Sequence, residues 1–141
     1  MNRTLAIIKP DAVGSGKAGR ILAHLEDAGF KIEALKMMRL SESQAREFYE
    51  VHKERPFYDS LVAFMTSGPC VPMVLGAEGA VPKLRDAIGA TDPAEAAPGT
   101  IRALYAENKE RNGIHASDSD DNAIREIAFF FSEQERLGLA G

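Results

Sequence analysis

The chain has 141 residues, of which 45% are hydrophobic and 27% are charged, and it carries a formal net charge of −4 at pH 7. This composition is typical of a single globular domain with one core and excludes a disordered protein. The acidic balance argues against nucleic-acid binding through a broad basic surface, and no apolar run is long enough for a membrane span or a secretion signal. We therefore expect a cytoplasmic protein without a nucleic-acid or membrane partner.

Hydrophobic periodicity divides the chain into short strands and helices. In chain order, the predicted elements are a strand over 4–9, a helix over 17–28, a strand over 31–40, helices over 41–53 and 58–65, a strand over 68–75, a helix over 77–88, a helical turn over 101–105 and a helix over 119–131. The first strand is apolar and ends at Pro10, so we expect it at the centre of a sheet with both faces buried. Ser41 and Gln44 form the capping-box signature of a helix start.

Several details add to this pattern. Alternation slips within the second strand, which indicates a bulge, and Pro72 indicates an irregularity or a free edge in the third. Residues 89–113 are rich in glycine and proline, and long loops of this kind tend to be functional. Cys70 has apolar neighbours and is interpreted as a buried structural thiol. Four apolar residues at helical spacing predict the buried face of the last helix: Ile124, Ile127, Ala128 and Phe131.

The glycines at residues 14–19 (GSGKAG) match the G-x-G-x-x-G pattern of dinucleotide-binding turns. In that fold the first glycine directly follows the strand, whereas residues 10–13 intervene here. A phosphate-binding P-loop would need glycine at position 11 and Ser or Thr at position 18, where this chain has Asp11 and Ala18. We therefore interpret these glycines as a flexible turn before a helix, with an NAD-dependent enzyme as the alternative.

His115 lies in residues 112–119, just ahead of the last predicted helix. A neutral imidazole is a nucleophile near neutral pH, and the unpaired N–H groups at a helix start can bind an anion. Both properties suit phosphate chemistry. Taken by the local residues alone, a capping or surface histidine is the favoured interpretation, because most histidines near turns are of this kind, and catalysis is the alternative.

Five motifs, taken together, decide between these two interpretations of His115. They are KPD at 9–11, HKERPF at 52–57, GATDP at 89–93, PGTIR at 98–102 and N-x-x-H-x-SDS at 112–119. In this order and spacing, the chain resembles the nucleoside diphosphate kinases from about residue 4 to residue 131. The resemblance implies one α+β, ferredoxin-like domain (βαββαβ) over 1–141, with an antiparallel four-stranded sheet covered by helices and a short tail over 132–141. It also implies ping-pong transfer of a γ-phosphoryl group from a nucleoside triphosphate to a nucleoside diphosphate through a phosphohistidine.

The resemblance assigns roles residue by residue. His115 matches the nucleophile, Glu126 the acidic residue that orients it, and Tyr49 a supporting residue beside it. Phe57 matches the aromatic ring on which the base stacks, with Leu61 next to it, and this mode of binding tolerates every base. The other predicted nucleotide-binding residues match phosphate and ribose contacts: Lys9, Arg85, Thr91, Arg102 and Asn112. Arg55 lies in a matching motif as either a ligand contact or a structural residue.

The implied cofactor is Mg²⁺, carried by the nucleotide phosphates with no metal ligand from the protein, because the aspartates at 118, 120 and 121 suit a helix start. The implied partners are nucleoside triphosphates and diphosphates, including ATP, GTP, pyrimidine and deoxy forms, and further copies of the chain in a tetramer, hexamer or dimer. Ala116 departs from the glycine that often follows the nucleophile in the family. The alternative function is a nucleotide-binding regulatory or scaffold protein without turnover.

Overall fold

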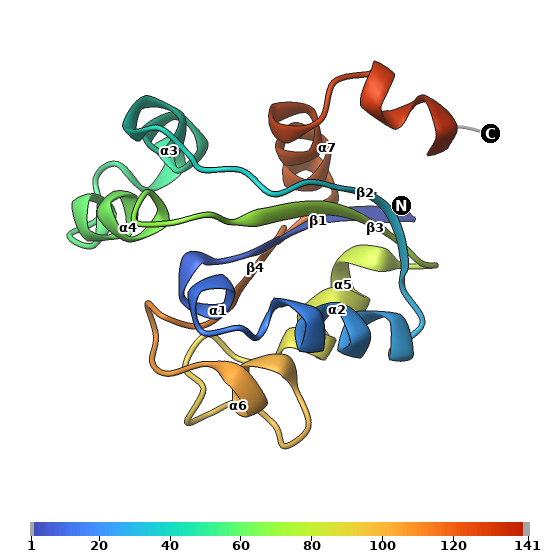
Figure 1. Cartoon of the computed structure of the whole chain (residues 1–141), viewed down its shortest axis with the longest axis horizontal. Helices are drawn as coiled ribbons and strands as arrows, with labels where there is room; N and C mark the ends of the chain where they lie inside the picture. Colours follow the sequence, from blue (N-terminus) through green and yellow to red (C-terminus); the bar gives the residue numbers. More distant parts are fainter. Residues whose placement is uncertain (1, 140–141) are drawn as a thin grey trace.

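The computed structural model describes residues 2–139, with the exposure of side chains described for residues 2–136. Its centre is a four-stranded antiparallel sheet in the order β2-β3-β1-β4 (Figure 1). The strands are β1 (Arg3–Ile8), β2 (Lys31–Leu35), β3 (Val71–Gly76) and β4 (Ile114–Ala116). The helices are α1 (Pro10–Gly14), α2 (Ala18–Asp27), α3 (Glu42–Phe48), α4 (Tyr58–Met65), α5 (Ala80–Ile88), α6 (Ile101–Tyr105) and α7 (Asp120–Phe130), with short 3₁₀ helices η1 (Glu50–His52) and η2 (Gln134–Leu139).

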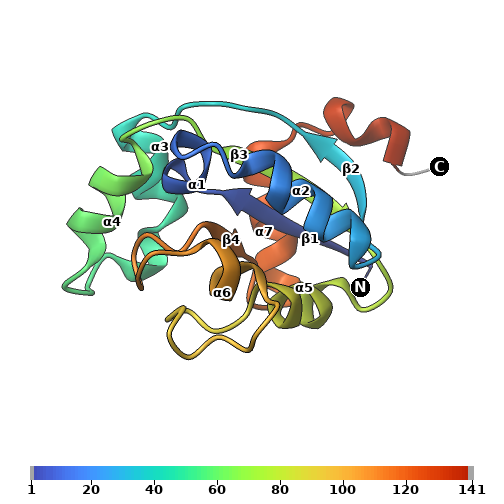
Figure 2. The ribbon, with the colours of Figure 1, turned by 60° about the horizontal axis from the view of Figure 1, so that its bottom comes forward.

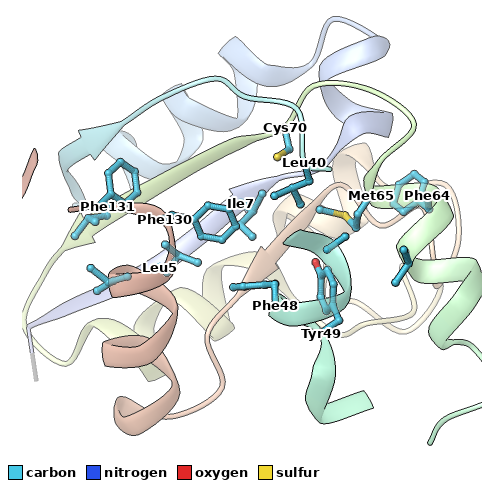
Figure 3. Packing of buried hydrophobic residues seen from close by; sticks show 14 residues of the cluster. Leu5, Ile7, Leu40, Phe48, Tyr49, Phe64, Met65, Cys70, Phe130 and Phe131 are labelled. Carbon is cyan, nitrogen blue, oxygen red and sulfur yellow. The ribbon is translucent and has the colours of Figure 1, made fainter. Parts of the chain in front are cut away.

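Helices cover both faces of the sheet, and β1 supplies side chains to both resulting cores. Leu5 and Ile7 of β1 belong to the cluster that includes residues of α3, α4 and α7, and Figure 3 shows this cluster. Ala6 and Ile8 point to the other face and belong to the cluster with α2, α5 and α6. In Figure 2, where this second face comes forward, α2 crosses in front of β1 and α7 lies behind. The predicted central strand with two buried faces is confirmed.

Several other predictions are confirmed by the element bounds. The ferredoxin-like order is present, α4 and α6 have the predicted limits, and α2 lies within the predicted helix over 17–28. Ser41 accepts a hydrogen bond from the Gln44 N–H, and the Gln44 side chain accepts one from the Ser41 N–H, which completes the capping box. The bulge in β2 lies between Ile32 and Ala34. Cys70 is fully buried, and burial raises the pKa of its thiol to about 11.

Four predictions needed correction. Gly14 ends helix α1, so the glycine segment joins two helices rather than a strand and a helix, and the dinucleotide-binding alternative loses its structural context. The second strand ends at Leu35, and the helix predicted over 41–53 ends at Phe48 and continues as η1. Of the two predicted alternatives for Pro72, the free edge does not apply because β3 is internal, whereas an irregularity agrees with the β2–β3 ladder, which ends at Leu35 opposite Met73.

The fourth correction concerns the buried face of α7. Ile124 is 58% exposed and Ala128 is also exposed, so the predicted stripe is wrong at two of its four positions. The face that packs on the sheet contains Ala123, Glu126, Ile127 and Phe130. The buried carboxylate of Glu126 interrupts this face, so the apolar periodicity of the sequence does not reveal it. The residues that explain why Glu126 is buried lie in the cleft described next.

Candidate active site

A cleft of about 720 Å³ gathers side chains from segments far apart in the sequence. Its walls come from the end of β1, the segment from α3 to α4, α5, the irregular residues 89–113, β4 and α7. All ten residues predicted from the resemblance line it: Lys9, Tyr49, Phe57, Leu61, Arg85, Thr91, Arg102, Asn112, His115 and Glu126. Arg55 is exposed and does not line the cleft. This position does not support a ligand contact, which was one of the two interpretations of Arg55.

His115 is the middle residue of β4, a strand that the residue pattern did not predict because it is only three residues long. Ile114 and Ala116 point into the cluster on the α5 side, so His115 points to the opposite face, toward α7. There its Nε2 lies 2.7 Å from Oε1 of Glu126, and the same oxygen accepts a hydrogen bond from the Ser117 hydroxyl at 2.8 Å. The buried carboxylate on α7 therefore serves to hold His115.

The charge of Glu126 determines which nitrogen of His115 carries hydrogen. Burial acts to raise the pKa of Glu126, but the hydrogen bonds from His115 and Ser117 and the charges of His115 and Arg125 outweigh it, so the pKa lies below its usual value. An ionised carboxylate only accepts hydrogen bonds, so Nε2 of His115 is the donor. In the neutral ring Nδ1 then keeps its lone pair, and no described residue forms a hydrogen bond with it.

Two aromatic rings flank His115 in edge contacts, with centroid distances of 5.4 Å to Phe48 and 6.2 Å to Tyr49. The Tyr49 hydroxyl is buried without a hydrogen bond among the described residues and points into the buried cluster (Figure 3). Burial and the Glu126 charge both raise its pKa. Tyr49 therefore contacts the imidazole with its ring and not with its hydroxyl.

The turn that leads into β4 is held by the KPD motif at the end of β1. The Lys9 N–H donates to the Gly113 carbonyl at 2.9 Å, and the Gly113 N–H donates to Oδ2 of Asp11 at 3.1 Å. The Lys9 ammonium also donates to Oδ1 of Asn112 at 2.8 Å. Gly113 has a φ of +83°, a conformation that favours glycine. Asp11 is thus a candidate functional residue that was not predicted from the sequence, although it belongs to the KPD motif.

Desolvated cations line the cleft near His115. The Arg102 guanidinium is 7% exposed, donates to the carbonyls of Gly89 at 3.1 Å and Ile114 at 2.7 Å, and has a buried Nε without a partner among the described residues. Burial and the Arg85 charge lower its pKa to about 10. Burial and the Arg102 charge lower the pKa of Lys9 to about 8. These positive groups repel one another, and a polyanion between them would relieve that repulsion.

The far end of the cleft is open and apolar. Phe57, at the start of α4, is 46% exposed, and Leu61 follows one helical turn later. The His52 ring lies 5.5 Å from the Phe57 ring, measured between centroids. Eight lining residues were not predicted as site residues, and most lie within or near the motifs: Val51, His52, Lys109, Glu110, Ala116, Asp118, Asn122 and Arg125. The cations at one end of the cleft would suit the phosphates of a nucleotide, and the exposed Phe57 ring at the other end would suit its flat base.

The described residues contain no group of three or more His, Cys, Asp or Glu side chains that could hold a metal ion. Asp118 instead accepts a hydrogen bond from the Asn122 side chain at 2.5 Å, and Ser119 caps α7 by accepting from the Asn122 N–H. Within residues 2–139, no helix is long and apolar enough to cross a membrane. The acidic segment thus forms the start of α7.

Comparisons with known proteins agree with this geometry. The sequence model of the family described as "Nucleoside diphosphate kinase" matches residues 2–136. The chain is 56% identical to the nucleoside diphosphate kinase of Desulfatibacillum aliphaticivorans over 98% of this chain and 100% of the relative. It is 57% identical to that of Nitratiruptor sp. over 97% and 100%.

Solved structures give the same result. The Aquifex aeolicus nucleoside diphosphate kinase has a TM-score of 0.93 at 50% identity, covering 95% of this chain and 97% of that one. The Halobacterium salinarum enzyme, solved in complex with CDP, has a TM-score of 0.91 at 43% identity, covering 96% and 91%. The agreement of sequence, fold and family model over nearly the whole chain shows that it belongs to the nucleoside diphosphate kinase family, enzymes that transfer a phosphoryl group between nucleoside triphosphates and diphosphates.

Proposed function

We propose that the chain transfers the γ-phosphoryl group of a nucleoside triphosphate, typically ATP, to a nucleoside diphosphate by a ping-pong mechanism in which His115 is phosphorylated. The observation that carries this proposal is the bond between His115 Nε2 and Glu126, which leaves the Nδ1 lone pair without a partner among the described residues. Such an activity would maintain the nucleoside and deoxynucleoside triphosphate pools in the cytoplasm.

In the first half-reaction, Nδ1 of neutral His115 attacks the γ-phosphorus. The N–P bond forms as the bond from the γ-phosphorus to the bridging β–γ oxygen breaks, and the electron pair leaves with the diphosphate. Positive charge that develops on the ring is stabilised by Glu126, which accepts the Nε2–H bond, and Ser117 holds that carboxylate in place.

In the second half-reaction, a terminal oxygen of the β-phosphate of a second nucleoside diphosphate attacks the same phosphorus. The N–P bond breaks and its electron pair returns to Nδ1. Charge spreads over the phosphoryl oxygens in both steps, so positioned cations lower the barrier. We assign this task to Arg85 and Arg102, with Thr91 as a hydroxyl donor and with Lys9 and Asn112 at the ribose and the neighbouring phosphate.

The base stacks on Phe57 beside Leu61 in our proposal, which gives broad base and sugar tolerance. The CDP complex of the H. salinarum relative supports pyrimidine nucleotides as substrates. We propose that Mg²⁺ enters with the nucleotide, because it commonly bridges phosphates while keeping water ligands. The carboxylates in the cleft fit this arrangement, since Glu126, Asp118 and Glu110 each accept a hydrogen bond from a protein donor.

We also propose that the chain assembles as a homo-oligomer, a tetramer or hexamer, or else a dimer. β2 is an edge strand of the sheet, and it and the residues after it expose Leu35 (45%) and Met37 (61%). Unpaired strand edges with exposed apolar side chains commonly pair with another copy. Light scattering of the purified protein tests this assembly, and a monomeric mass would contradict it.

The decisive test of the function is the phosphoenzyme. Incubation with γ-labelled ATP and Mg²⁺ should label the protein with a phosphate that is labile in acid and stable in alkali, and an unlabelled diphosphate should discharge it. His115→Ala should abolish labelling, whereas the control His24→Ala, on α2 outside the cleft, should not. Labelling of His115→Ala would reject His115 as nucleophile. Nucleotide binding without labelling or discharge would instead indicate a regulatory or scaffold protein.

A further inference from the structure

A hydrogen bond joins α4 to the turn after α6, which carries the cleft residue Glu110. The Ser60 hydroxyl on α4 donates to Oε2 of Glu110 at 2.7 Å. Glu110 belongs to a turn after α6 that is itself fixed, because the Asn108 side chain accepts hydrogen bonds from the N–H groups of Glu110 and Arg111. The Glu110 carboxylate is therefore held at a defined place beside α4.

That place is next to the proposed base platform. Phe57 and Ser60 are three residues apart at the start of α4, where the Leu61 N–H donates to the Phe57 carbonyl as in a regular helical turn. Residues at this spacing lie about 5–6 Å apart on one face of a helix. Phe57 and Glu110 both line the cleft. A nucleotide base stacked on Phe57 thus has its polar edge within reach of the Glu110 carboxylate.

A carboxylate only accepts hydrogen bonds, and Ser60 uses one of its several acceptor positions. Cytosine and adenine present an exocyclic amino group, and guanine presents an N–H beside an amino group. Uracil and thymine present carbonyl oxygens on both sides of their single N–H, and these oxygens repel the carboxylate. We propose that Glu110, held by Ser60, reads the base edge and favours bases with an amino group over uracil and thymine; this inference rests on the proposed function, in which the base stacks on Phe57.

Lys109 lies next to Glu110 and also lines the cleft, and its ammonium is a donor with the opposite preference. Its backbone carbonyl accepts a hydrogen bond from the Asn112 side chain, but no described side chain holds its ammonium. A fixed charge loses less conformational freedom on binding than a free one, so Glu110 dominates the preference. The opposite ranking, with uracil favoured, would identify Lys109 as the reading residue.

CDP and UDP provide the sharpest test because they differ at ring position 4, amino against carbonyl, and in the ring hydrogen beside it. With one phosphate donor, kcat/KM for CDP should exceed that for UDP by about three- to tenfold, the size expected for one hydrogen bond to a partly solvated charge. GDP should exceed inosine diphosphate, which lacks the 2-amino group, by a similar factor. In Glu110→Gln, whose amide both donates and accepts, both ratios should fall to near one.

Glu107→Gln is the matched control, because it removes the same charge from the same turn at an exposed residue that does not line the cleft. It should keep both wild-type ratios. Dissociation constants of CDP and UDP, measured without turnover, should show the same preference and the same loss in Glu110→Gln. Wild-type ratios near one, or ratios unchanged in Glu110→Gln, would overturn the inference. Absence of transfer to any diphosphate would reject the proposed function, while the two dissociation constants would still decide this inference.

Discussion

The two ends of the cleft are built in opposite ways. Around His115 the polar side chains that bond one another are buried, with Glu126 5% exposed and Asn112 2% exposed, whereas Arg85 and Asp118 at the same end are exposed. At the base end, Phe57 is 46% exposed and Val51 is 75% exposed, and the Ser60–Glu110 bridge is exposed to solvent. The imidazole of His115 is thus held by hydrogen bonds within the protein, whereas the surface around Phe57 is left open.

This difference matches what each end has to do. Phosphoryl transfer is the same reaction for every nucleotide, so a preorganised geometry lowers the barrier in every case. The bases differ in their edges but share a flat face, so an open aromatic ring accepts all of them. Substitutions at the phosphate end should therefore reduce turnover, and substitutions at the base end should reduce affinity.

Glu126→Ala should have the largest effect among the positioning residues. It removes the acceptor that orients Nε2 of His115 and leaves the buried Ser117 hydroxyl unpaired. We expect kcat to fall by about 100-fold or more, as when the orienting member of a catalytic group is lost, with nucleotide affinity nearly unchanged. Steady-state kinetics measures this, with Glu133→Ala, at an exposed glutamate beyond α7, as control. Equal losses in the two variants would contradict the assigned role.

Asp11→Ala should have the next largest effect, again on kcat. Gly113 would lose its N–H acceptor, and the turn that presents His115 two residues later would shift. Small misplacements of reacting groups are costly, so we expect kcat to fall by about tenfold while the dissociation constant of ADP stays within about twofold. Asp11→Asn keeps an acceptor oxygen and should restore most of the activity. Identical kinetics for the two variants would show that this bond does not position His115.

Asp11 illustrates how far the sequence could predict the site. Residues whose chemistry is distinctive, such as His115 and Arg102, could be assigned by family motif, and all ten assigned residues line the cleft. Asp11 accepts one hydrogen bond from Gly113, which lies 102 residues away in the chain. Ser117 donates one to Glu126, which lies 9 residues away. Such pairings depend on the tertiary fold, which local patterns do not encode.

The fold was predictable to a similar extent. Elements with strong periodicity or a clear cap, such as α4 and the Ser41–Gln44 capping box, were predicted correctly. The three-residue strand β4 was not, because its pairing with β1 is set by long-range contacts and not by its own sequence. The buried face of α7 differs from the prediction because it contains a carboxylate, Glu126, which is buried where it bonds His115 and Ser117.

Phe57→Ala tests the open end. Stacking contributes about 1–3 kcal/mol per base in nucleic-acid sites, and since Phe57 is 46% exposed we expect a loss near the lower limit, about fivefold in affinity. The dissociation constants of ADP, GDP, CDP and UDP should all rise by a similar factor, while Phe57→Tyr should stay close to wild type. A loss confined to purines would show that stacking on Phe57 is not the shared mode of binding.

Lys9 should make affinity and stability respond to pH in opposite directions. Its pKa of about 8 lies below the ordinary 10.5, so between these values the unfolded chain binds more protons than the folded one. The free energy of unfolding should then rise with pH by about 1 kcal/mol per unit over this range, relative to Lys9→Gln. ADP affinity should fall severalfold above about pH 8, as the ammonium is lost. Denaturant titrations and ADP binding at several pH values test both trends, and parallel trends would reject this role.

Ala116→Gly should have the smallest effect, although it introduces the glycine that the family resemblance leads us to expect after His115. Ala116 has an ordinary extended backbone in β4, pairs with Ala6 and is 6% exposed, so its methyl group causes no strain and contributes to the core. Glycine would lose this buried methyl and gain freedom in the unfolded chain, which should destabilise the protein by about 1 kcal/mol in urea titrations. We expect kcat/KM to stay within about twofold, because the Glu126 bond and the Gly113 turn fix His115 without help from residue 116. A clear rise in kcat would mean that the methyl group obstructs the phosphate, and that the phosphate end is less well preorganised than its hydrogen bonds indicate.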